Sequence, residues 1–327
     1  MLKFITSLFV IALLVALPAR ADDAFKVSWV EGKDYVSLRE LARVYTCAAQ
    51  GPQGRSINLF NKWNKLAFTT NGREVMINDV LVWMHEPLQL VNKRWMIRAV
   101  DARKVIDPIL RPSENLKSVG HRIVVLDPGH GGQDTGAKGR RGVEEKRVVL
   151  DVARRVRTQL QQAGVKVYMT RESDRFIELD DRCKKTRSWG GDVFVSIHLN
   201  SAPSALPGGT ETYTIASAGY ASTAGGSSSA ALNGNKYEGA NSALGYYVHK
   251  SLTQRINEGD RGVKRSRFLV LKNAPCPAIL VECLFVSNRS EEEKLLNDAF
   301  RESMAQGISR GILNYLNAVK RAKLSEP

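Results

Sequence analysis

Several signatures of common site types are missing from this sequence of 327 residues. It has only four cysteines (Cys47, Cys183, Cys276 and Cys283) and no CxxC pair, which argues against a zinc site built from cysteines. Cys276 and Cys283 flank one predicted strand, so an extended backbone holds them too far apart to pair. No GxxxxGK motif is present, so the glycine-rich segments do not match a phosphate-binding loop. We expect buried thiols rather than a disulfide framework.

The N-terminus lacks an apolar run long enough for a membrane span, which needs about 20 residues. Its apolar stretch, about residues 8–17, follows Lys3 and precedes the small residues Ala19 and Ala21. This pattern predicts a secretory signal peptide over residues 1–21, with no stable membrane span after cleavage. No cysteine stands at the cleavage position, which argues against a lipoprotein. We therefore expect an exported protein of the periplasm, the cell envelope or the extracellular space.

Acidic residues are too few to balance the basic ones. The chain has 48 lysines and arginines and 33 aspartates and glutamates, for a formal charge of +15. Removing residues 1–21 takes away Lys3 and Arg20 and no acid, which leaves 15 − 2, or +13. Such a charge favours anionic partners. For an exported protein these are the carboxylates of peptidoglycan stem peptides and other envelope polyanions, and not nucleic acid; a basic surface that only confers solubility is the alternative.

A glycine-rich segment after a short apolar run is the most informative feature present. Residues 123–126 (IVVL) predict a buried strand, and the following DPGHGG presents His130 at the end of that strand. The glycines leave room for a close approach to this histidine. Apolar residues then recur at helical spacing, which predicts a helix over residues 145–163 that Gly164 closes. Glu145, in its first turn, can face the strand end that holds His130.

Two further strands carry side chains of the same kinds. The run DVFVSIHLN predicts a strand that presents His198, and the run AILVEC predicts a strand that buries Glu282. Parallel strands bring their carboxyl ends to one edge, where open α/β sheets bind their ligands. His130, Glu145 and His198 would then form the two-histidine, one-glutamate set of catalytic zinc sites. The buried carboxyl group of Glu282 requires a metal, a partner or a catalytic task.

The alternation of strands and helices predicts the fold class. We expect an α/β domain with an open, mostly parallel sheet covered by helices on both faces, preceded by a small α+β domain. A further strand is predicted over residues 268–271, and Ser290 with Glu293 predicts a capping box that starts a long terminal helix. The expected segments are a signal peptide (1–21), a stalk-like module (22–108), a linker (109–120), the catalytic domain (121–319) and a basic tail (320–327).

The motifs, taken in order, resemble those of the zinc-dependent N-acetylmuramoyl-L-alanine amidases of the amidase_3 type. The matching segments are DPGHGGQDTGAKG, EK, MTRESDRFIELDDR, SIHLN, DRGVKRSRFLVLKNAPCPAILVE and FVSN. The resemblance implies cleavage of the amide bond between the lactyl group of muramic acid and L-alanine of the stem peptide. It also implies that His130, Glu145 and His198 bind Zn²⁺ and that Glu282 is catalytic. Glu144 is a neighbouring alternative ligand, but it does not directly precede Lys146.

The resemblance leaves specific points open. The family usually has Gly-Gly-Phe or Gly-Phe after the catalytic glutamate, whereas Cys283 and Leu284 precede Phe285 here, which concerns the shape of the pocket floor. Asp127 and Asn200 are candidates for orienting the histidines, with hydrogen bonding at strand ends as the alternative. Arg171 and Arg182 are expected to brace loops through carboxylates, with a substrate role as the alternative. His85 and His249 are expected to be structural.

The N-terminal module has a weaker resemblance. A turn at Asn71-Gly72 predicts a hairpin, and residues 38–45 predict a short helix. The YVSLREL and RWMIRAVDAR segments resemble the copper amine oxidase N-terminal-like domain, a stalk module of exported hydrolases whose name does not imply copper binding. Its tryptophans are candidates for a glycan-stacking platform, or for the core of the module; they are Trp29, Trp63, Trp83 and Trp95.

Residues 203–247 are rich in glycine, serine, alanine and asparagine, and we interpret them as a mobile flap beside the site. Some relatives carry an inhibitory helix there that a protein activator displaces, but this composition argues against a stable helix. An activator remains a candidate partner. Two other functions remain alternatives: a non-catalytic protein that binds peptidoglycan or activates another enzyme, and a zinc peptidase that cuts stem peptides.

Overall fold

The computed structural model describes residues 24–325, so the predicted signal peptide lies outside the described residues. Its main sheet has eleven strands in the order β11-β10-β12-β17-β13-β16-β7-β6-β5-β4-β3. The C-terminal part, called the catalytic half because the predicted site residues lie in it, contributes six strands. They are β11 (Lys166–Met169), β10 (Ile123–Pro128), β12 (Val193–Asn200), β17 (Ala278–Phe285), β13 (Thr210–Ile215) and β16 (Asp260–Ser266). Neighbouring strands from β11 to β17 are parallel, whereas β13 is antiparallel to β17 and parallel to β16. The predicted mostly parallel sheet is therefore confirmed.

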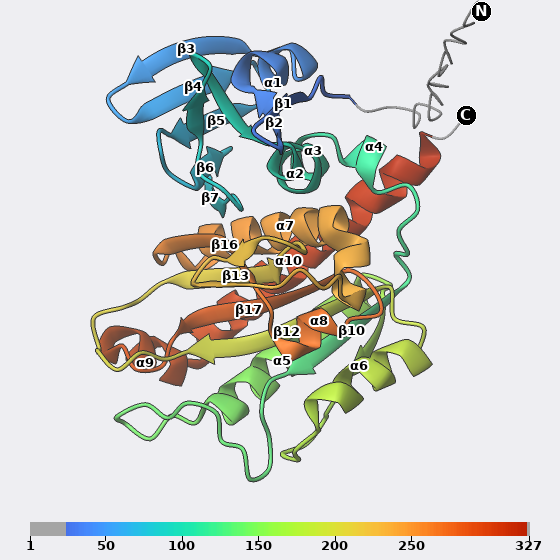
Figure 1. Cartoon of the computed structure of the whole chain (residues 1–327). Helices are drawn as coiled ribbons and strands as arrows, with labels where there is room; N and C mark the ends of the chain where they lie inside the picture. The colour runs from blue at the N-terminus through green and yellow to red at the C-terminus, as the bar shows by residue number, and fades with distance from the viewer. Residues whose placement is uncertain (1–23, 326–327) are drawn as a thin grey trace, which may run out of the picture.

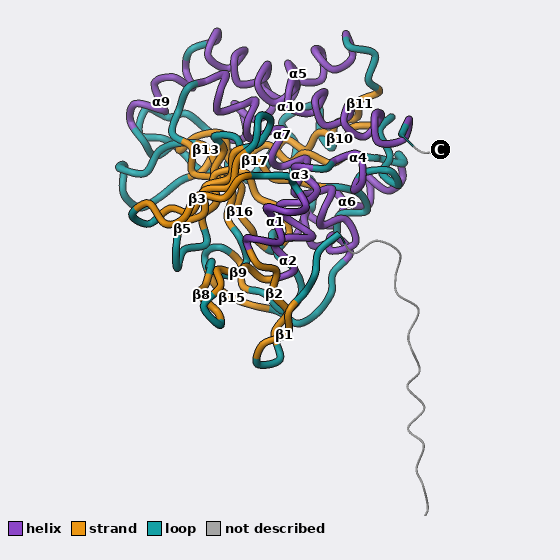
Figure 2. The backbone as a smooth tube through the Cα atoms, turned by 90° about the horizontal axis from the view of Figure 1, so that it is seen from above, coloured by secondary structure: helices purple, strands orange, loops and turns teal. Residues whose placement is uncertain are grey.

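Helices cover both faces of this half, as predicted. One face packs against α5 (Glu145–Gln162), α7 (Glu238–Ile256) and α10 (Asp298–Leu324), which share an apolar core with alternate residues of the strands. The other face packs against α6 (Leu179–Ser188) and α8 (Leu269–Lys272). Figure 2 shows α5 and α10 together on one side of the strands. Alternate strand residues are apolar on both sides because both faces are covered.

Helix α5 shows how the sequence pattern becomes structure. Val148, Val152, Val156 and Leu160 follow one another at four-residue steps, and all four are buried. These positions lie on one face of a helix, which packs that face onto the sheet. Gly164 follows with φ of +79°, a left-handed conformation that glycine adopts without steric cost and that ends the helix. The predicted bounds of this helix are confirmed within one residue.

The N-terminal part is built mainly from antiparallel strands. The smaller sheet holds β1 (Ser28–Val30), β2 (Lys33–Ser37), β9 (Arg94–Arg98) and β8 (Gln89–Val91). The strands that join the main sheet are β3 (Ala48–Gln53), β4 (Ser56–Phe60), β5 (Lys65–Thr69), β6 (Glu74–Ile77) and β7 (Val80–Trp83). The predicted hairpin at Asn71-Gly72 joins β5 to β6, and the predicted helix is α1 (Leu38–Val44), which Ser37 caps through Glu40. Both predictions are confirmed.

The N-terminal strands are not a separate unit in the structure. A parallel bridge between Val82 of β7 and Val263 of β16 joins them to the catalytic sheet, so one sheet runs through both parts (Figure 1). The predicted polar linker includes α4 (Pro112–Asn115), and Leu116 and Val119 beyond it are buried in the catalytic core. These two apolar side chains fasten the segment to the catalytic part. The domain boundaries themselves remain a prediction.

Two local predictions near the C-terminus are wrong. Residues 268–271 are not a strand; a short helix, α8, begins at Leu269, and the strand before it is β16. The terminal helix is also divided: α9 (Arg289–Leu296) is capped by Asn288, whose side chain accepts hydrogen bonds from Ser290 and Glu291, and α10 starts after Asn297. An asparagine is as good an N-cap as serine, so the expected Ser290–Glu293 box does not form.

No helix within residues 24–325 combines the length and the hydropathy that crossing a membrane requires.

Candidate metal centre

Two histidines and one glutamate converge at the carboxyl ends of the parallel strands. His130 follows β10, His198 lies near the end of β12, and Glu145 is the first residue of α5. One ligand atom from each lies within 4.8 Å of the others. His130 and the two glycines after it all have positive φ values, of +59°, +126° and +59°, which turn the chain sharply at the strand end. The structure thus brings together the three residues predicted to bind a metal.

Glycines next to this group are required by close packing. A Cβ atom on Gly129 would lie 2.2 Å from Cε1 of His198, and one on Gly136 would lie 2.6 Å from Oε2 of Glu145. Both distances are far below van der Waals contact, so a side chain at either position would displace the group. The glycine-rich sequence around His130 is therefore part of the site's construction.

Glu145 links the two imidazoles. Its Oε1 atom lies 3.1 Å from Nε2 of His130 and 3.0 Å from Nδ1 of His198, and it accepts a hydrogen bond from the backbone of Leu199. Oε2 accepts a hydrogen bond from the backbone of Ala137. Burial alone would raise the pKa of this carboxyl group, but hydrogen bonds from His130 and His198 lower it well below its usual value. Glu145 is therefore an anion that faces two nitrogen donors.

The neighbouring candidate, Glu144, does not take part. Its carboxylate contacts Lys138 and Arg147, 3.7 and 2.9 Å away, on the outside of the loop. Two imidazoles and one carboxylate within coordination reach match the donor set of catalytic zinc sites, which leaves one position of the tetrahedron open. The residues present therefore fit a metal ion of this kind.

Asp134, which the sequence analysis did not identify, orients His130. Its Oδ2 atom lies 2.8 Å from Nδ1 of the imidazole, and mutual backbone hydrogen bonds between Gly131 and Asp134 close the turn. Burial alone would lower the pKa of His130, but its hydrogen bonds to Glu145 and Asp134 raise it. A carboxylate on the far nitrogen fixes the tautomer and orientation of a ligand histidine. The signal available in the sequence was an aspartate four residues after the histidine.

Two buried arginines hold the turn that carries His130, as predicted, but mainly through backbone oxygens; only Arg182 uses a carboxylate, that of Asp127. Arg171 donates hydrogen bonds to the backbone oxygens of Pro128, Gly129 and Lys146. Arg182 donates to the backbone oxygens of Pro128 and His130 and to the carboxylate of Asp127. Asp127 also accepts hydrogen bonds from Thr170 and Ser196. Asp127 therefore has the strand-end role, which was the alternative to orienting a histidine.

Glu282 lies one strand away from the metal-binding group. It is paired in register with His198 across β17 and β12, so both side chains emerge on the same face. Within residues 24–325, its Oε2 atom is buried and has no hydrogen-bond partner. Burial, followed by the charges of Glu145 and Glu211, raises the pKa of Glu282 well above its usual value. A raised pKa favours the protonated form of this carboxyl group.

The sequence of the catalytic half was compared with known families. Residues 124–314 match the family Amidase_3, described as N-acetylmuramoyl-L-alanine amidase. The chain belongs to this family. The match covers more than half of the chain and includes both histidines, Glu145 and Glu282. The part before residue 124 lies outside it.

Individual relatives agree with this assignment. The amidase LytC of Bacillus subtilis is 37% identical over 193 residues, and the amidase AmiA of Escherichia coli is 33% identical over 226 residues. These alignments cover 59% and 62% of this chain, and 35% and 78% of the relatives. The chain thus spans about a third of LytC but most of AmiA.

Solved amidase structures share the fold of the catalytic half. AmiC2 of Nostoc punctiforme is 34% identical with a TM-score of 0.52, and the catalytic domain of CwlV from Bacillus (Paenibacillus) polymyxa is 35% identical with a TM-score of 0.52. Each is covered over 99% of its length, against 61% and 60% of this chain. The parts of this chain that these structures do not cover therefore include its N-terminal strands.

One residue of the departure after Glu282, Cys283, does not face the metal-binding group. Cys283 is fully buried among the apolar residues that pack against α5, α7 and α10, on the opposite face of β17 from Glu282. Because side chains alternate along a strand, the thiol points away from the metal-binding group. All four cysteines are free, and three of them are buried.

The predicted flap is correct only in part. Residues 201–209 follow β12 at the edge where His198 lies, but β13 then crosses the sheet, and residues 216–237 lie at the other end of the strands. Arg267 anchors that second stretch through hydrogen bonds to the backbone of Ser217, Tyr220 and Gly226. Asn200, the other predicted orienter, donates to Glu211 rather than to a histidine. Strand-end hydrogen bonding is the role that the structure gives it.

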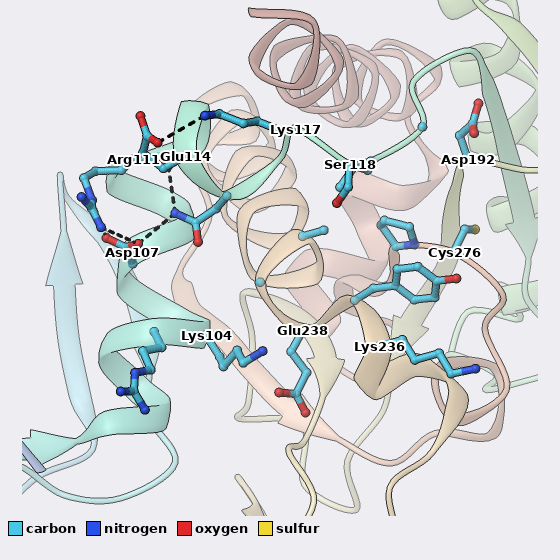
Figure 3. A pocket seen from close by; sticks show the side chains of 18 of the residues that line it. Lys104, Asp107, Arg111, Glu114, Lys117, Ser118, Asp192, Lys236, Glu238 and Cys276 are labelled. Carbon is cyan, nitrogen blue, oxygen red and sulfur yellow. Dashed lines mark hydrogen bonds and ion pairs between the residues drawn. The ribbon is translucent and has the colours of Figure 1, made fainter. Parts of the chain in front are cut away.

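A large cleft of about 1230 Å³ lies between the N-terminal and catalytic parts of the chain. The cleft is lined by residues just before the starts of three parallel strands. They are Gly120 before β10, Asp192 before β12 and Pro277 before β17. Lys104, Asp107, Arg111 and Glu238 are among its other lining residues (Figure 3). The cleft is therefore at the opposite ends of the strands from His130, His198 and Glu145, and it is not the reaction centre.

Proposed function

We propose that this chain is an exported, zinc-dependent N-acetylmuramoyl-L-alanine amidase that cleaves the amide bond between muramic acid and L-alanine of peptidoglycan. One observation carries the proposal: His130, Glu145 and His198 converge at one sheet edge, with Glu282 paired beside His198 on the same face. In this proposal the three converging residues hold Zn²⁺, and Glu282 is the catalytic residue. Membership of the amidase family supports the choice of bond.

The reaction is hydrolysis of an amide. A zinc ion held by the three residues would supply a Lewis acid, which polarises a carbonyl group and lowers the pKa of water from about 16 to about 7. Glu282 takes a proton from the attacking water through its unpartnered Oε2 atom and delivers it to the leaving nitrogen. The carbon–nitrogen bond breaks, which yields the lactyl carboxylate and the free amino group of L-alanine. The raised pKa of Glu282 suits the second transfer, in which it acts as an acid.

The chain's own residues prepare this step. Asp134 and Glu145 hold the His130 imidazole from its two nitrogens, and Arg171 and Arg182 fix the backbone that carries it. Groups held in place before the reaction do not have to reorganise during it, which is the main source of catalytic stabilisation in such sites.

Export, the substrate and the N-terminal module complete the proposal. The sequence of residues 1–21 supports export to the periplasm, the envelope or the medium, where peptidoglycan is accessible.

The likeness of the N-terminal part to the copper amine oxidase N-terminal-like domain remains a prediction. Trp29 and Trp63 are exposed, at 73% and 74%, which leaves them available for stacking on glycan rings, whereas Trp95 packs against the module's core.

Mass spectrometry of digested peptidoglycan tests the proposal. Purified peptidoglycan is incubated with the protein lacking residues 1–21, with and without added zinc, and with the Glu282→Ala variant beside it. Release of intact stem peptides that begin with L-alanine, lost in the variant, is the expected result. Cleavage between amino acids would instead identify a zinc peptidase. No cleavage by the zinc-loaded protein would point to a missing protein activator or to a non-catalytic, peptidoglycan-binding role.

A further inference from the structure

A row of polar side chains continues from Glu282 across the sheet, away from the metal-binding group. Glu211 of β13 is paired in register with Glu282 of β17, and Tyr213 of β13 is paired with Lys264 of β16. Paired residues emerge on the same face of a sheet. His198, Glu282, Glu211 and Lys264 therefore lie in sequence along one face, on four neighbouring strands.

Glu211 is a buried anchor at the centre of this row. Its carboxylate accepts hydrogen bonds from Arg261, Lys264, Tyr213 and Asn200, at 2.6, 2.7, 2.5 and 3.0 Å. Burial alone would raise the pKa of Glu211, but the hydrogen bonds from Arg261, Lys264 and Tyr213 lower it. One anion thus holds two cations, so the cluster keeps one positive charge in excess.

Arg261 binds Glu211 through only one of its nitrogens and is partly exposed. Its Nε atom binds Glu211, and its guanidinium group lies over the Phe285 ring, 5.1 Å from the ring centre. Within residues 24–325, its two terminal nitrogens make no hydrogen bond, and 39% of its side chain is exposed. A guanidinium group fixed through Nε and stacked on a ring offers its remaining N–H groups in a set direction. That geometry is suited to a carboxylate.

Residues of the N-terminal part contact the start of β16, which carries Arg261 and Lys264. Trp83 of β7 donates a hydrogen bond to the backbone oxygen of Arg261, and its ring lies 5.9 Å from Nζ of Lys264. A Cβ atom on Gly262 would lie 2.8 Å from Cδ1 of Trp83, so glycine is required between the two cations. The backbone of Leu81 also donates to Asp260, at the start of β16. The joined sheet therefore fixes the position of the two cations.

We propose that Arg261, supported by Glu211, Lys264 and Trp83, binds a free carboxylate of the stem peptide and is a specificity-determining residue. The proposal rests on the amidase function proposed above. Neighbouring strands are about 4.8 Å apart, so β16 lies about 10 Å from β17, which carries Glu282. An extended peptide advances about 3.5 Å per residue, so this span reaches the second or third residue of a stem bound at Glu282. The side chain of Arg261, reaching back toward Glu211, favours the second.

Two matched substrates test this role. Both are muramyl tripeptides that begin with L-alanine and continue with an acidic second residue, whose carboxylate is free in one and converted to a carboxamide in the other. With the zinc-loaded full chain, we expect kcat/KM about tenfold higher for the free carboxylate, mainly through KM, as for one charge-assisted hydrogen bond. In Arg261→Gln, both substrates should react like the carboxamide does with the unchanged chain. Arg261→Lys should recover only part of the preference, because lysine lacks the planar fork.

Controls separate this proposal from the function on which it rests. Arg255→Gln removes an equal charge from α7, where Arg255 pairs with Gln306 on the helical face, and should keep the full preference. Zinc content and the circular dichroism spectrum of Arg261→Gln should match those of the unchanged chain. Equal kcat/KM for the two substrates, or a preference that survives in Arg261→Gln, would overturn the proposal while the amidase function stands. Cleavage between amino acids of both substrates, with the bond to muramic acid left intact, would overturn both.

Discussion

Histidines meet carboxylates in two kinds of places in this molecule, and only one kind is built to hold a ligand. At the sheet edge, His130 and His198 gather around the single carboxylate of Glu145, and their side chains stay 24% and 18% exposed. Between the N-terminal and catalytic parts, His85 and His249 are each buried and pair with a carboxylate of their own, Asp101 and Asp260.

In the two buried pairs, neither histidine has a ring nitrogen free to bind a ligand. His85 bonds to Asp101 through Nδ1 and accepts a hydrogen bond from the backbone of Ser217 at Nε2. His249 contacts Asp260 through one nitrogen and Thr212 through the other. With both nitrogens engaged and no open space beside them, these histidines join segments distant in sequence. Convergence on one shared, partly open point therefore distinguishes a ligand histidine from a structural one.

Loss of a ligand histidine should have the largest effect. We expect His198→Ala to abolish both zinc binding and turnover, because two protein ligands do not make a catalytic zinc site. Zinc per chain, measured by plasma mass spectrometry after dialysis, should fall from about one to near zero. Retention of stoichiometric zinc in this variant would remove His198 from the ligand set.

Loss of Glu282 should separate binding from chemistry. We expect Glu282→Gln to keep its zinc but to lose about 10²- to 10⁴-fold in kcat, the usual contribution of a general acid–base group. Turnover is followed by release of stem peptides, and zinc is measured on the same sample. Undiminished turnover would show that another group transfers the proton.

Removal of the charge on Asp134 should have a smaller effect. Asp134→Asn keeps the size of the side chain but weakens its hold on His130, so zinc affinity should fall about 10- to 100-fold. Competition with a chelator of known affinity measures this change. Asp260→Asn is the matched control, because Asp260 bonds to His249 and should leave zinc affinity unchanged.

Disruption of a buried pair should change stability instead of metal binding. We expect His249→Ala to lower the free energy of unfolding by about 1–3 kcal/mol, since Thr212 and Asp260 each lose a partner. Chemical denaturation of the metal-free protein gives this value, and zinc affinity should match that of the unchanged chain. A loss of zinc in the folded variant would end the distinction between the two kinds of histidine.

The smallest expected effect is on the pH dependence of stability. Burial raises the pKa of Glu282 above its usual value of 4.5, so the folded state binds this proton more tightly than the unfolded state. The stability from Glu282 is then complete below pH 4.5 and is lost as the pH rises through the folded-state pKa. Metal-free Glu282→Gln should therefore gain stability over the unchanged protein, by about 1 kcal/mol or more, between acidic and neutral pH. Parallel pH curves for the two proteins in thermal melts would contradict this expectation.

The sequence predicted the parts of this molecule that local pattern determines. The apolar spacing in α5 and the runs that became β10, β12 and β17 predicted the core of the catalytic half, and the ends of β10 and β12 located His130 and His198. Short apolar runs were ambiguous: FLVL before Lys272 forms one helical turn, because four residues do not distinguish a helix from a strand. Strand β16 was missed because it is rich in charged residues, of which Arg265 is buried.

The remaining features depend on contacts that no local pattern contains. The bridge between Val82 and Val263 joins residues 181 positions apart (263 − 82), so only the folded chain shows that one sheet runs through both parts. Asp134 belongs to the DPGHGGQDTGAKG motif, but its hydrogen bond to His130 depends on the positive φ values of the turn, which the motif alone does not show. The hydrogen bonds to the Asp127 carboxylate are likewise donated by residues of three other segments, namely Thr170, Arg182 and Ser196.

The location of bound zinc tests the central claim most directly. Crystals of the full chain grown with zinc are measured on both sides of the zinc absorption edge, and an anomalous difference map is calculated. A single strong peak bounded by His130, Glu145 and His198 is the predicted result. No peak at these residues, or a peak beside His85 or His249 in its place, would contradict the assignment of the metal centre and the mechanism built on it.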